Sequence, residues 1–343
     1  MLLRPQLCLV VCLGWLISSS ALADEPQPRV LRAGMIGLDT SHVPAFTRLF
    51  NDPKATGDVA GIKVVAGYPG GTDYPPSRDR VERFTQGMRE AGVEIVNTIP
   101  ELLEKVDVVL LESVDGRIHL EEAIPVIKAR KPVFIDKPLA ASLVDAVVIL
   151  ELAKKYNVPC FSSSSLRFGD EIQAALNNDA IGEIVGAATW GPSGYQPGTP
   201  DLCFYGIHGV EALFTLMGPG CQTVSRVQTD QGDEVIGTWS GNRIGTFRGI
   251  RRGSSSFGAI VFGSKSIQQV PTTASYRGLC HQIGRFFRTG KAPVDPETTI
   301  EIFAFIEAAD ESKRQGGKPV AIADVLEKAR REAAAKLAAI EAQ

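Results

Sequence analysis

The strongest constraint on the fold is a strand, a glycine turn and a helix start in residues 32–42. A short apolar run ends at Gly37 and leads directly into a helical pattern, which is typical of a nucleotide-binding βαβ unit. In such units, N–H groups at the helix N-terminus hold a pyrophosphate. Counted from Gly37, the G-x-G-x-x-G pattern requires two more glycines, but the chain has Asp39 and His42 there. The candidate cofactor-binding residues are Gly37, Leu38, Asp39, Thr40, Ser41 and His42.

The alternation of strand and helix continues after this turn. Apolar strand-like runs are expected at 62–67, 93–96, 106–111, 132–135 and 158–162. Helical segments are expected at 43–50, 81–91, 100–105, 120–129 and 143–156. This order predicts an α/β domain with a doubly wound parallel sheet. We place this Rossmann-like dinucleotide-binding domain at 24–163.

The pattern changes in the second half of the chain, which we expect to form a substrate and oligomerisation domain at 164–343. A helix at 171–178 leads to strand-like runs at 183–190, 221–229, 234–240, 244–250, 257–263 and 265–270. Short turns join the last five runs, which predicts an α+β domain with a large open, mainly antiparallel sheet. Helices are expected at 296–313 and from 323 to the end. Because one face of such a sheet is free to pair, we expect a homodimer or homotetramer through it.

The first 23 residues have the pattern of a secretory signal peptide. Arg4 precedes an apolar run at 7–17, and the small residues at 21–23 form a cleavage site. The run is too short to span a bilayer, so we expect cleavage after Ala23, a periplasmic or secreted protein and no membrane association. An oxidising compartment permits disulfides among four cysteines, although a domain of this size does not need them. These cysteines are Cys160, Cys203, Cys221 and Cys280.

Charge and spacing argue against two classes of partner. The formal net charge is -3, and no basic run is interleaved with aromatic residues, so nucleic acid is not expected. No C-x-x-C or paired-histidine spacing indicates a metal site, and none is expected.

A charged pair follows one of the predicted buried strands. Asp136 and Lys137 come directly after the apolar run 132–135, which places them at the carboxyl edge of the parallel sheet. A lysine there, with a neighbour that alters its pKa, suits proton transfer with a substrate hydroxyl. A surface turn before a helix is the alternative interpretation.

A second candidate group surrounds one of only four histidines in the chain. His208 opens an apolar helix, and Glu211 lies three residues further along the same face. A histidine beside a carboxylate can act as a general base, although a histidine at a helix start is often structural. The glycine- and proline-rich loop before it, 191–200, carries Tyr195 and is either a substrate lid or a long surface loop. Tyr205 lies close before His208.

Together these residues resemble the Gfo/Idh/MocA family of glucose–fructose oxidoreductases and inositol dehydrogenases. The resemblance rests on the opening βαβ unit, Asp136-Lys137-Pro138 at the E-K-P position, Arg167, His208 and the segment 286–291. It covers about 30–320. It implies a Rossmann domain that binds NAD or NADP, a C-terminal domain with an open sheet, and a small carbohydrate or polyol as substrate.

The resemblance also implies roles for single residues. Lys137 corresponds to the active-site lysine, and His208 to the histidine that relays the proton of a sugar hydroxyl. Arg167, with Tyr195 and Tyr205 as further candidates, would line the substrate pocket. His119 corresponds to the histidine after the fourth strand, near the nicotinamide.

Four departures from the family pattern concern the cofactor and the chemistry. Asp39 replaces a glycine, no acid stands at the end of the run 62–67, Asp136 shortens the glutamate of E-K-P, and Phe204 replaces an aspartate. Asp201 or Glu211 could substitute for that aspartate. Three functions therefore stay open: an NAD(P)-dependent oxidoreductase, a redox-neutral NAD-dependent glycosidase or epimerase, and a carbohydrate-binding relative without cofactor.

Overall fold

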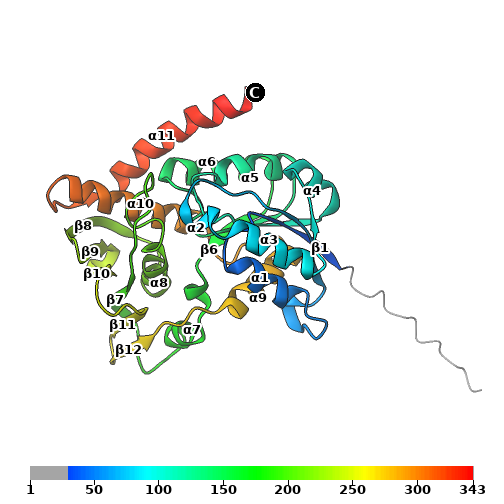
Figure 1. Ribbon diagram of the computed structural model, residues 1–343. Coiled ribbons are helices and arrows are strands. Elements are labelled where there is room, and N and C mark those ends of the chain that lie inside the picture. The colour runs from blue at the N-terminus through cyan, green and yellow to red at the C-terminus, as the bar shows by residue number, and fades with distance from the viewer. Residues whose placement is uncertain (1–29, 343) are drawn as a thin grey trace, which may run out of the picture.

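The computed structural model describes residues 30–342, in which two sheets each carry their own helices (Figure 1). The predicted signal peptide lies outside the described residues. Over the described range, no helix is long and apolar enough to cross a membrane.

The first sheet has six parallel strands in the order β3-β2-β1-β4-β5-β6. They are β1 (Leu31–Ile36), β2 (Ile62–Tyr68), β3 (Glu94–Ile95), β4 (Val108–Leu111), β5 (Val133–Asp136) and β6 (Cys160–Ser163). The strands are short and almost entirely apolar, as expected for a sheet buried on both faces. The predicted doubly wound fold is confirmed.

Helices cover both faces of this sheet. On one side lie α4 (Ile99–Lys105), α5 (His119–Lys128) and α6 (Leu143–Lys155). On the other lie α1 (His42–Phe50), α3 (Val81–Glu90) and α9 (Tyr276–Thr289). Successive side chains of a strand point to opposite faces, so Met35 belongs to one core and Ile36 to the other. A single helical turn, α2 (Pro75–Arg78), lies in the connection from β2 to α3, where the sequence predicted only a loop.

Helix α9 was not predicted, although its sequence has a helical pattern. The Ser275 side chain accepts a hydrogen bond from the N–H of Gly278 and caps the helix, whose apolar side chains recur at helical spacing. Ile283 and Phe286 are fully buried in the same core as α1 and β1. A segment from beyond residue 164 thus completes the core of the first domain.

The second sheet has seven strands in the order β12-β11-β7-β10-β9-β8-β13. They are β7 (Ile184–Pro192), β8 (Cys221–Thr229), β9 (Gly232–Trp239), β10 (Arg243–Ile250), β11 (Gly258–Gly263), β12 (Ile267–Pro271) and β13 (Val320–Ala321). Only β7 and β10 pair in parallel, and the other pairs are antiparallel. The predicted mainly antiparallel sheet is confirmed.

Two helices, α8 (Ile207–Met217) and α10 (Pro296–Arg314), pack against this sheet. The helix α7 (Asp170–Leu176) follows β6, and α11 (Ile322–Glu341), red in Figure 1, packs along α6. The sheet also leaves apolar side chains exposed, among them Val227, Ile236 and Ile244. The homo-oligomer through this sheet stays a prediction. The four cysteines of the described chain are buried and free.

Candidate active site

The candidate site lies at the carboxyl edge of the first sheet, where the strand order changes direction between β1 and β4. Ligands of open α/β sheets bind at such a point. The turn after β1 opens α1 at His42, Glu112 follows β4, and β5 ends at Asp136 before Lys137. The start of α8, in the second domain, adds His208. The topology therefore collects groups that are distant in the sequence.

A cavity of about 380 Å³ lies between these elements. Its walls include the predicted site residues Thr40, Ser41, His42, Lys137, Tyr205 and His208. Arg80, Phe204 and Tyr276 also line it and were not among the predicted site residues. Another cavity, of about 360 Å³ between α6, α10 and α11, contains none of the predicted residues. The cavity of about 380 Å³ is therefore the candidate site.

Lys137 is buried at the cavity wall between two aromatic rings. Its Nζ atom lies 5.9 Å from the ring centre of Phe204 and 5.8 Å from that of Tyr205. Burial lowers the pKa of Lys137 from its ordinary value, while the charge of Asp136 opposes this effect. An amine with a lowered pKa exchanges protons more readily near neutral pH.

His208 faces the same cavity and is held from behind. Its Nδ1 atom lies 2.7 Å from Oγ of Ser164, which leaves Nε2 as the nitrogen available to the cavity. Burial, and then the positive charge of Lys137, lowers the pKa of His208 well below its usual value. The ring is therefore neutral at neutral pH and can exchange a proton with a ligand.

Glu211, predicted to assist His208, has another set of partners. Its Oε2 atom accepts a hydrogen bond from Nε of Arg167 at 2.8 Å, and its Oε1 accepts one from the N–H of Ser164 at 3.3 Å. No hydrogen bond joins Glu211 to His208 within residues 30–342. Glu211 thus positions the segment that carries Ser164, which in turn holds His208. Arg167 is occupied by this ion pair and is not among the residues that line the cavity.

His119 is the first residue of α5 and is fully buried. Its Nε2 atom lies 2.6 Å from the carbonyl oxygen of Ser113, and its Nδ1 lies 3.3 Å from that of Leu139. Burial lowers the pKa of His119, so the neutral ring donates only one of these hydrogen bonds. The contacts hold two loops of the candidate site together.

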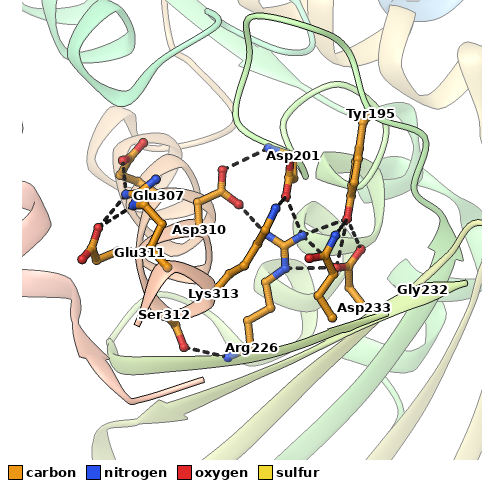
Figure 2. Close-up of polar contacts among 12 residues, drawn as sticks. Tyr195, Asp201, Arg226, Gly232, Asp233, Glu307, Asp310, Glu311, Ser312 and Lys313 are labelled. Carbon is orange, nitrogen blue, oxygen red and sulfur yellow. Dashed lines mark hydrogen bonds and ion pairs between the residues drawn. The ribbon is translucent and has the colours of Figure 1, made fainter. Parts of the chain in front are cut away.

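Tyr195 does not line the cavity but belongs to a cluster of polar residues. Figure 2 shows the contacts of this cluster. Arg226, fully buried on β8, contacts Asp201, Asp233 and Asp310, while Tyr195 receives a hydrogen bond from Arg226 at 2.9 Å. Arg251 and Lys313 complete the set, so three cations face three carboxylates. We call these six charged residues the Arg226 cluster. It anchors the loop 193–206, which carries Phe204 and Tyr205 at its end, to the sheet and α10.

The side chain of Asp39 ties the altered glycine turn to two neighbouring loops. Asp39 is fully buried; its Oδ1 accepts the N–H of Val114 at 2.8 Å, and its Oδ2 accepts the hydroxyl of Ser77 at 2.5 Å. Burial raises the pKa of Asp39 despite these hydrogen bonds. Asp39 therefore does not cap α1, which begins without a side-chain cap.

The backbone of the turn is occupied as well. The N–H of Leu38 donates to the carbonyl of Pro69 at 2.8 Å, so it is not available for a phosphate. Gly37 has a φ of 80° and packs so closely that a Cβ atom would lie 2.1 Å from Oγ of Ser113. The connection after β2 is tied down further on, where Thr72 donates to Asp115 at 2.9 Å.

Glu122, buried beneath this turn on α5, predicts a pH dependence of stability. Burial raises the pKa of Glu122 from 4.5 to about 8, although Ser113 donates a hydrogen bond to it at 2.7 Å. The folded protein binds the Glu122 proton more tightly than the unfolded chain does. The contribution of this group to the free energy of unfolding is therefore complete below the pKa that Glu122 has in the unfolded chain, and it is lost as the pH rises towards 8. Between pH 6 and pH 8 the loss is about 2 kcal/mol.

Glu122→Gln should remove this loss, because an amide does not ionise. The free energy of unfolding, measured in urea at pH 6, 7 and 8, should fall by about 2 kcal/mol less in the variant than in the wild type. Parallel pH profiles would mean that the folded protein accommodates the Glu122 carboxylate.

One imidazole and two carboxyl groups meet at the carboxyl ends of the strands of the first sheet. His42 Nδ1 lies 2.8 Å from Oδ2 of Asp136 and 3.8 Å from Oε2 of Glu112. Burial and the nearby charge of Asp136 raise the pKa of Glu112 well above its usual range. Glu112 was not among the predicted site residues, although it directly follows an apolar strand.

Known proteins match both the sequence and the fold. Residues 74–164 match the Gfo/Idh/MocA family, described as an oxidoreductase family with an NAD-binding Rossmann fold. Myo-inositol 2-dehydrogenase of Thermotoga maritima is 34% identical over 116 residues, 32% of this chain and 34% of that protein. The match thus spans about a third of the length of that relative.

Two solved structures extend the likeness to the whole fold. A probable dehydrogenase from Thermotoga maritima covers 86% of this chain and 100% of its own, with 21% identity and a TM-score of 0.67. Scyllo-inositol dehydrogenase from Lactobacillus casei, with bound NAD(H) and scyllo-inositol, covers 86% and 100%, with 13% identity and a TM-score of 0.70.

This chain joins a Rossmann-like domain to an open-sheet domain, and the two solved structures share that two-domain fold. Within the first domain, residues 74–164 are similar to the Gfo/Idh/MocA family. The predicted resemblance is confirmed, and NAD is the cofactor of the matched Rossmann family. The matched segment begins at residue 74 and so does not include the turn at 37–42.

The turn of this chain does not fit a dinucleotide in the described conformation. The link Ser77–Asp39–Val114 joins the loops after β1, β2 and β4, across the groove in which a pyrophosphate would lie. The strand β2 ends at Tyr68, which offers no carboxylate to a ribose. Binding of NAD would require the segment 69–80 to open.

Proposed function

We propose that the chain acts on a hydroxyl-bearing carbon of a cyclic polyol or a sugar, with proton exchange by Lys137 and His208. The observation that carries this proposal is that both side chains line one cavity of about 380 Å³. The inositol dehydrogenases among the similar proteins support the class of ligand.

The two groups have complementary environments. Lys137, whose pKa is lowered by burial, would accept the proton of a substrate hydroxyl. His208, held at Nδ1 by Ser164, would use Nε2 to exchange a proton with the same or a neighbouring oxygen. The rings of Phe204 and Tyr205 offer apolar surface to the C–H groups of a sugar ring.

The closed turn favours a second candidate, which is carbohydrate binding without a dinucleotide. A redox-neutral cleavage or epimerisation of a glycoside would need no free supply of NAD(P), but it would still need one bound NAD(P) to take up and return the hydride. The observation in its favour is the link from Asp39 to Ser77 and Val114.

A substrate screen tests the proposal and separates the candidates. The purified protein is incubated with inositols, sugars and aryl glycosides, each with NAD, with NADP and without either. Reduction of the cofactor indicates oxidation, whereas product release without net reduction indicates a redox-neutral reaction. Binding without turnover would support the carbohydrate-binding function, and neither binding nor turnover on any compound would contradict the proposal.

The turn itself predicts how NAD affinity responds to mutation. Two unit charges about 4 Å apart repel by about 4 kcal/mol at an effective dielectric constant near 20. Asp39→Gly removes both the carboxylate and its link to Ser77, so we expect NAD to bind at least about tenfold more tightly, measured by calorimetry.

Ser77→Ala is the matched variant, because it breaks the link but keeps the charge of Asp39. A gain in Asp39→Gly alone would identify the charge as the obstacle, and an equal gain in both variants would identify the closed loop. Unchanged affinity in both would show that Asp39 is not the obstacle.

Two further proposals concern the place and assembly of the protein. We retain a periplasmic or secreted location, supported by the signal-peptide pattern of residues 1–23. We retain a homo-oligomer through the second sheet, supported by exposed Val227, Ile236 and Ile244 on its strands.

A further inference from the structure

The groups at the base of the cavity form a compact set from three separate elements. His42 begins α1, Glu112 follows β4, and Asp136 ends β5. One ligand atom from each lies within 4.8 Å of the other two. All three side chains are buried, and only His42 lines the cavity.

Their polar atoms lack the hydrogen bonds that burial normally demands. Nine buried side-chain atoms in the described chain have no hydrogen-bond partner, and three of them are carboxylate oxygens of this set. They are Oε1 and Oε2 of Glu112 and Oδ1 of Asp136, whereas Nδ1 of His42 lies 2.8 Å from Oδ2 of Asp136. Buried polar atoms in native proteins almost always have a partner, and an unpaired buried carboxylate costs several kcal/mol. Their concentration in one place therefore points to a missing positive partner.

Within the described residues, His42 contacts one oxygen of Asp136, but the other three carboxylate oxygens are left without a hydrogen-bond partner. Lys137, the nearest lysine in the sequence, turns towards the rings of Phe204 and Tyr205 and forms no ion pair within residues 30–342. His42 packs its ring against Phe46 and Tyr276, with ring centres 5.2 Å and 4.8 Å away, which fixes the direction of its nitrogen atoms.

We propose that His42, Glu112 and Asp136 bind one divalent metal ion. One imidazole and two carboxylates suit Mn²⁺, Fe²⁺ or Zn²⁺ better than Ca²⁺, which prefers oxygen ligands alone. Ligand atoms about 2.1 Å from an ion stand roughly 3 to 4 Å apart, close to the separations in this set. The remaining coordination positions are available to water or to an oxygen atom of a ligand in the cavity.

The position of the site offers a physical reason for the altered dinucleotide fingerprint. His42 occupies the place of the third fingerprint glycine, and Asp39, at the place of the second, closes the turn above. The same turn that would hold a pyrophosphate thus supplies a metal ligand. A metal ion here would polarise a hydroxyl or carbonyl oxygen of the ligand beside Lys137.

Metal binding to the full chain, measured without substrate, tests this proposal. After treatment with a chelator, the protein is titrated with Mn²⁺ and with Zn²⁺ by calorimetry, and bound Mn²⁺ is counted by electron paramagnetic resonance. We expect one ion per chain and a higher unfolding temperature with metal. Absence of stoichiometric binding by the wild type would overturn the site.

Two variants and a matched control locate the ion. Glu112→Gln keeps the shape but removes the charge, and His42→Phe keeps the packed ring but removes the nitrogen; each should weaken metal binding at least about 100-fold. Glu122→Gln, also a buried glutamate near the turn, should bind metal as the wild type does. Wild-type affinity in both Glu112→Gln and His42→Phe would contradict the proposal.

The result is independent of the proposed polyol chemistry. Lys137→Met should lose turnover but keep the metal isotherm, because Lys137 is not a ligand in this set. A negative substrate screen would leave the isotherm unchanged, and a missing isotherm would leave the screen unaffected.

Discussion

Replacement of Lys137 by methionine is expected to reduce turnover about a thousandfold on whichever polyol or sugar the screen identifies. Methionine fills the space of the lysine stem but cannot exchange a proton. Because the lysine is buried without an ion pair within residues 30–342, the fold should persist, and an apolar replacement of a buried charge is often neutral for stability. Turnover is measured as the initial rate at saturating ligand.

The control for this prediction is Lys128→Met, an exposed lysine on α5. Its rate and its unfolding temperature should equal those of the wild type. A rate for Lys137→Met within tenfold of the wild type, in a variant with a normal circular dichroism spectrum, would remove Lys137 from the mechanism.

Replacement of Arg226 by methionine is expected to lower the free energy of unfolding by about 3 to 5 kcal/mol. Arg226 is fully buried and contacts Asp201, Asp233 and Asp310, so its loss leaves buried carboxylates without a partner. The unfolding temperature should fall by about 10 °C.

A matched substitution on the same sheet separates burial from charge. Arg248→Met removes an exposed ion pair with Glu234, 3.5 Å away, and should cost less than about 1 kcal/mol. Since the Arg226 cluster anchors the loop that ends at Phe204 and Tyr205, Arg226→Met should also weaken ligand binding. An equal stability loss in the two variants would show that the cluster does not depend on burial.

Most of the fold follows from local sequence pattern. The apolar runs that became β2, β4 and β5 alternate with helical spacing, and burial of both sheet faces demands such runs. Helix α9 was missed although its cap at Ser275 and its apolar spacing are visible in the sequence, because strand-like segments precede it. Its position against α1 depends on contacts over more than two hundred residues, which local pattern does not contain.

The residues of the candidate site were also predicted only in part. Lys137 and His208 were identified because each stands at an element boundary, where side chains reach a crevice. Arg167 was expected from the family resemblance, Glu211 from its spacing to His208 and Tyr195 from its loop. The structure instead joins Arg167 to Glu211 and Tyr195 to Arg226. A side chain at a loop can face a cavity or a structural partner, and the residue type alone does not distinguish the two.

The sequence by itself determined that a strand ends at Gly37, that a helix follows at His42, and that a dinucleotide fingerprint is altered between them, because these depend on residues adjacent in the chain. It also predicted no metal ligands, since spacing reveals only ligands that share one segment. The tertiary structure decided that Asp39 bonds to Ser77 and Val114 and that His42 meets Glu112 and Asp136. The physical reason is that parallel strands bring their carboxyl ends to one edge, however far apart they lie in the sequence.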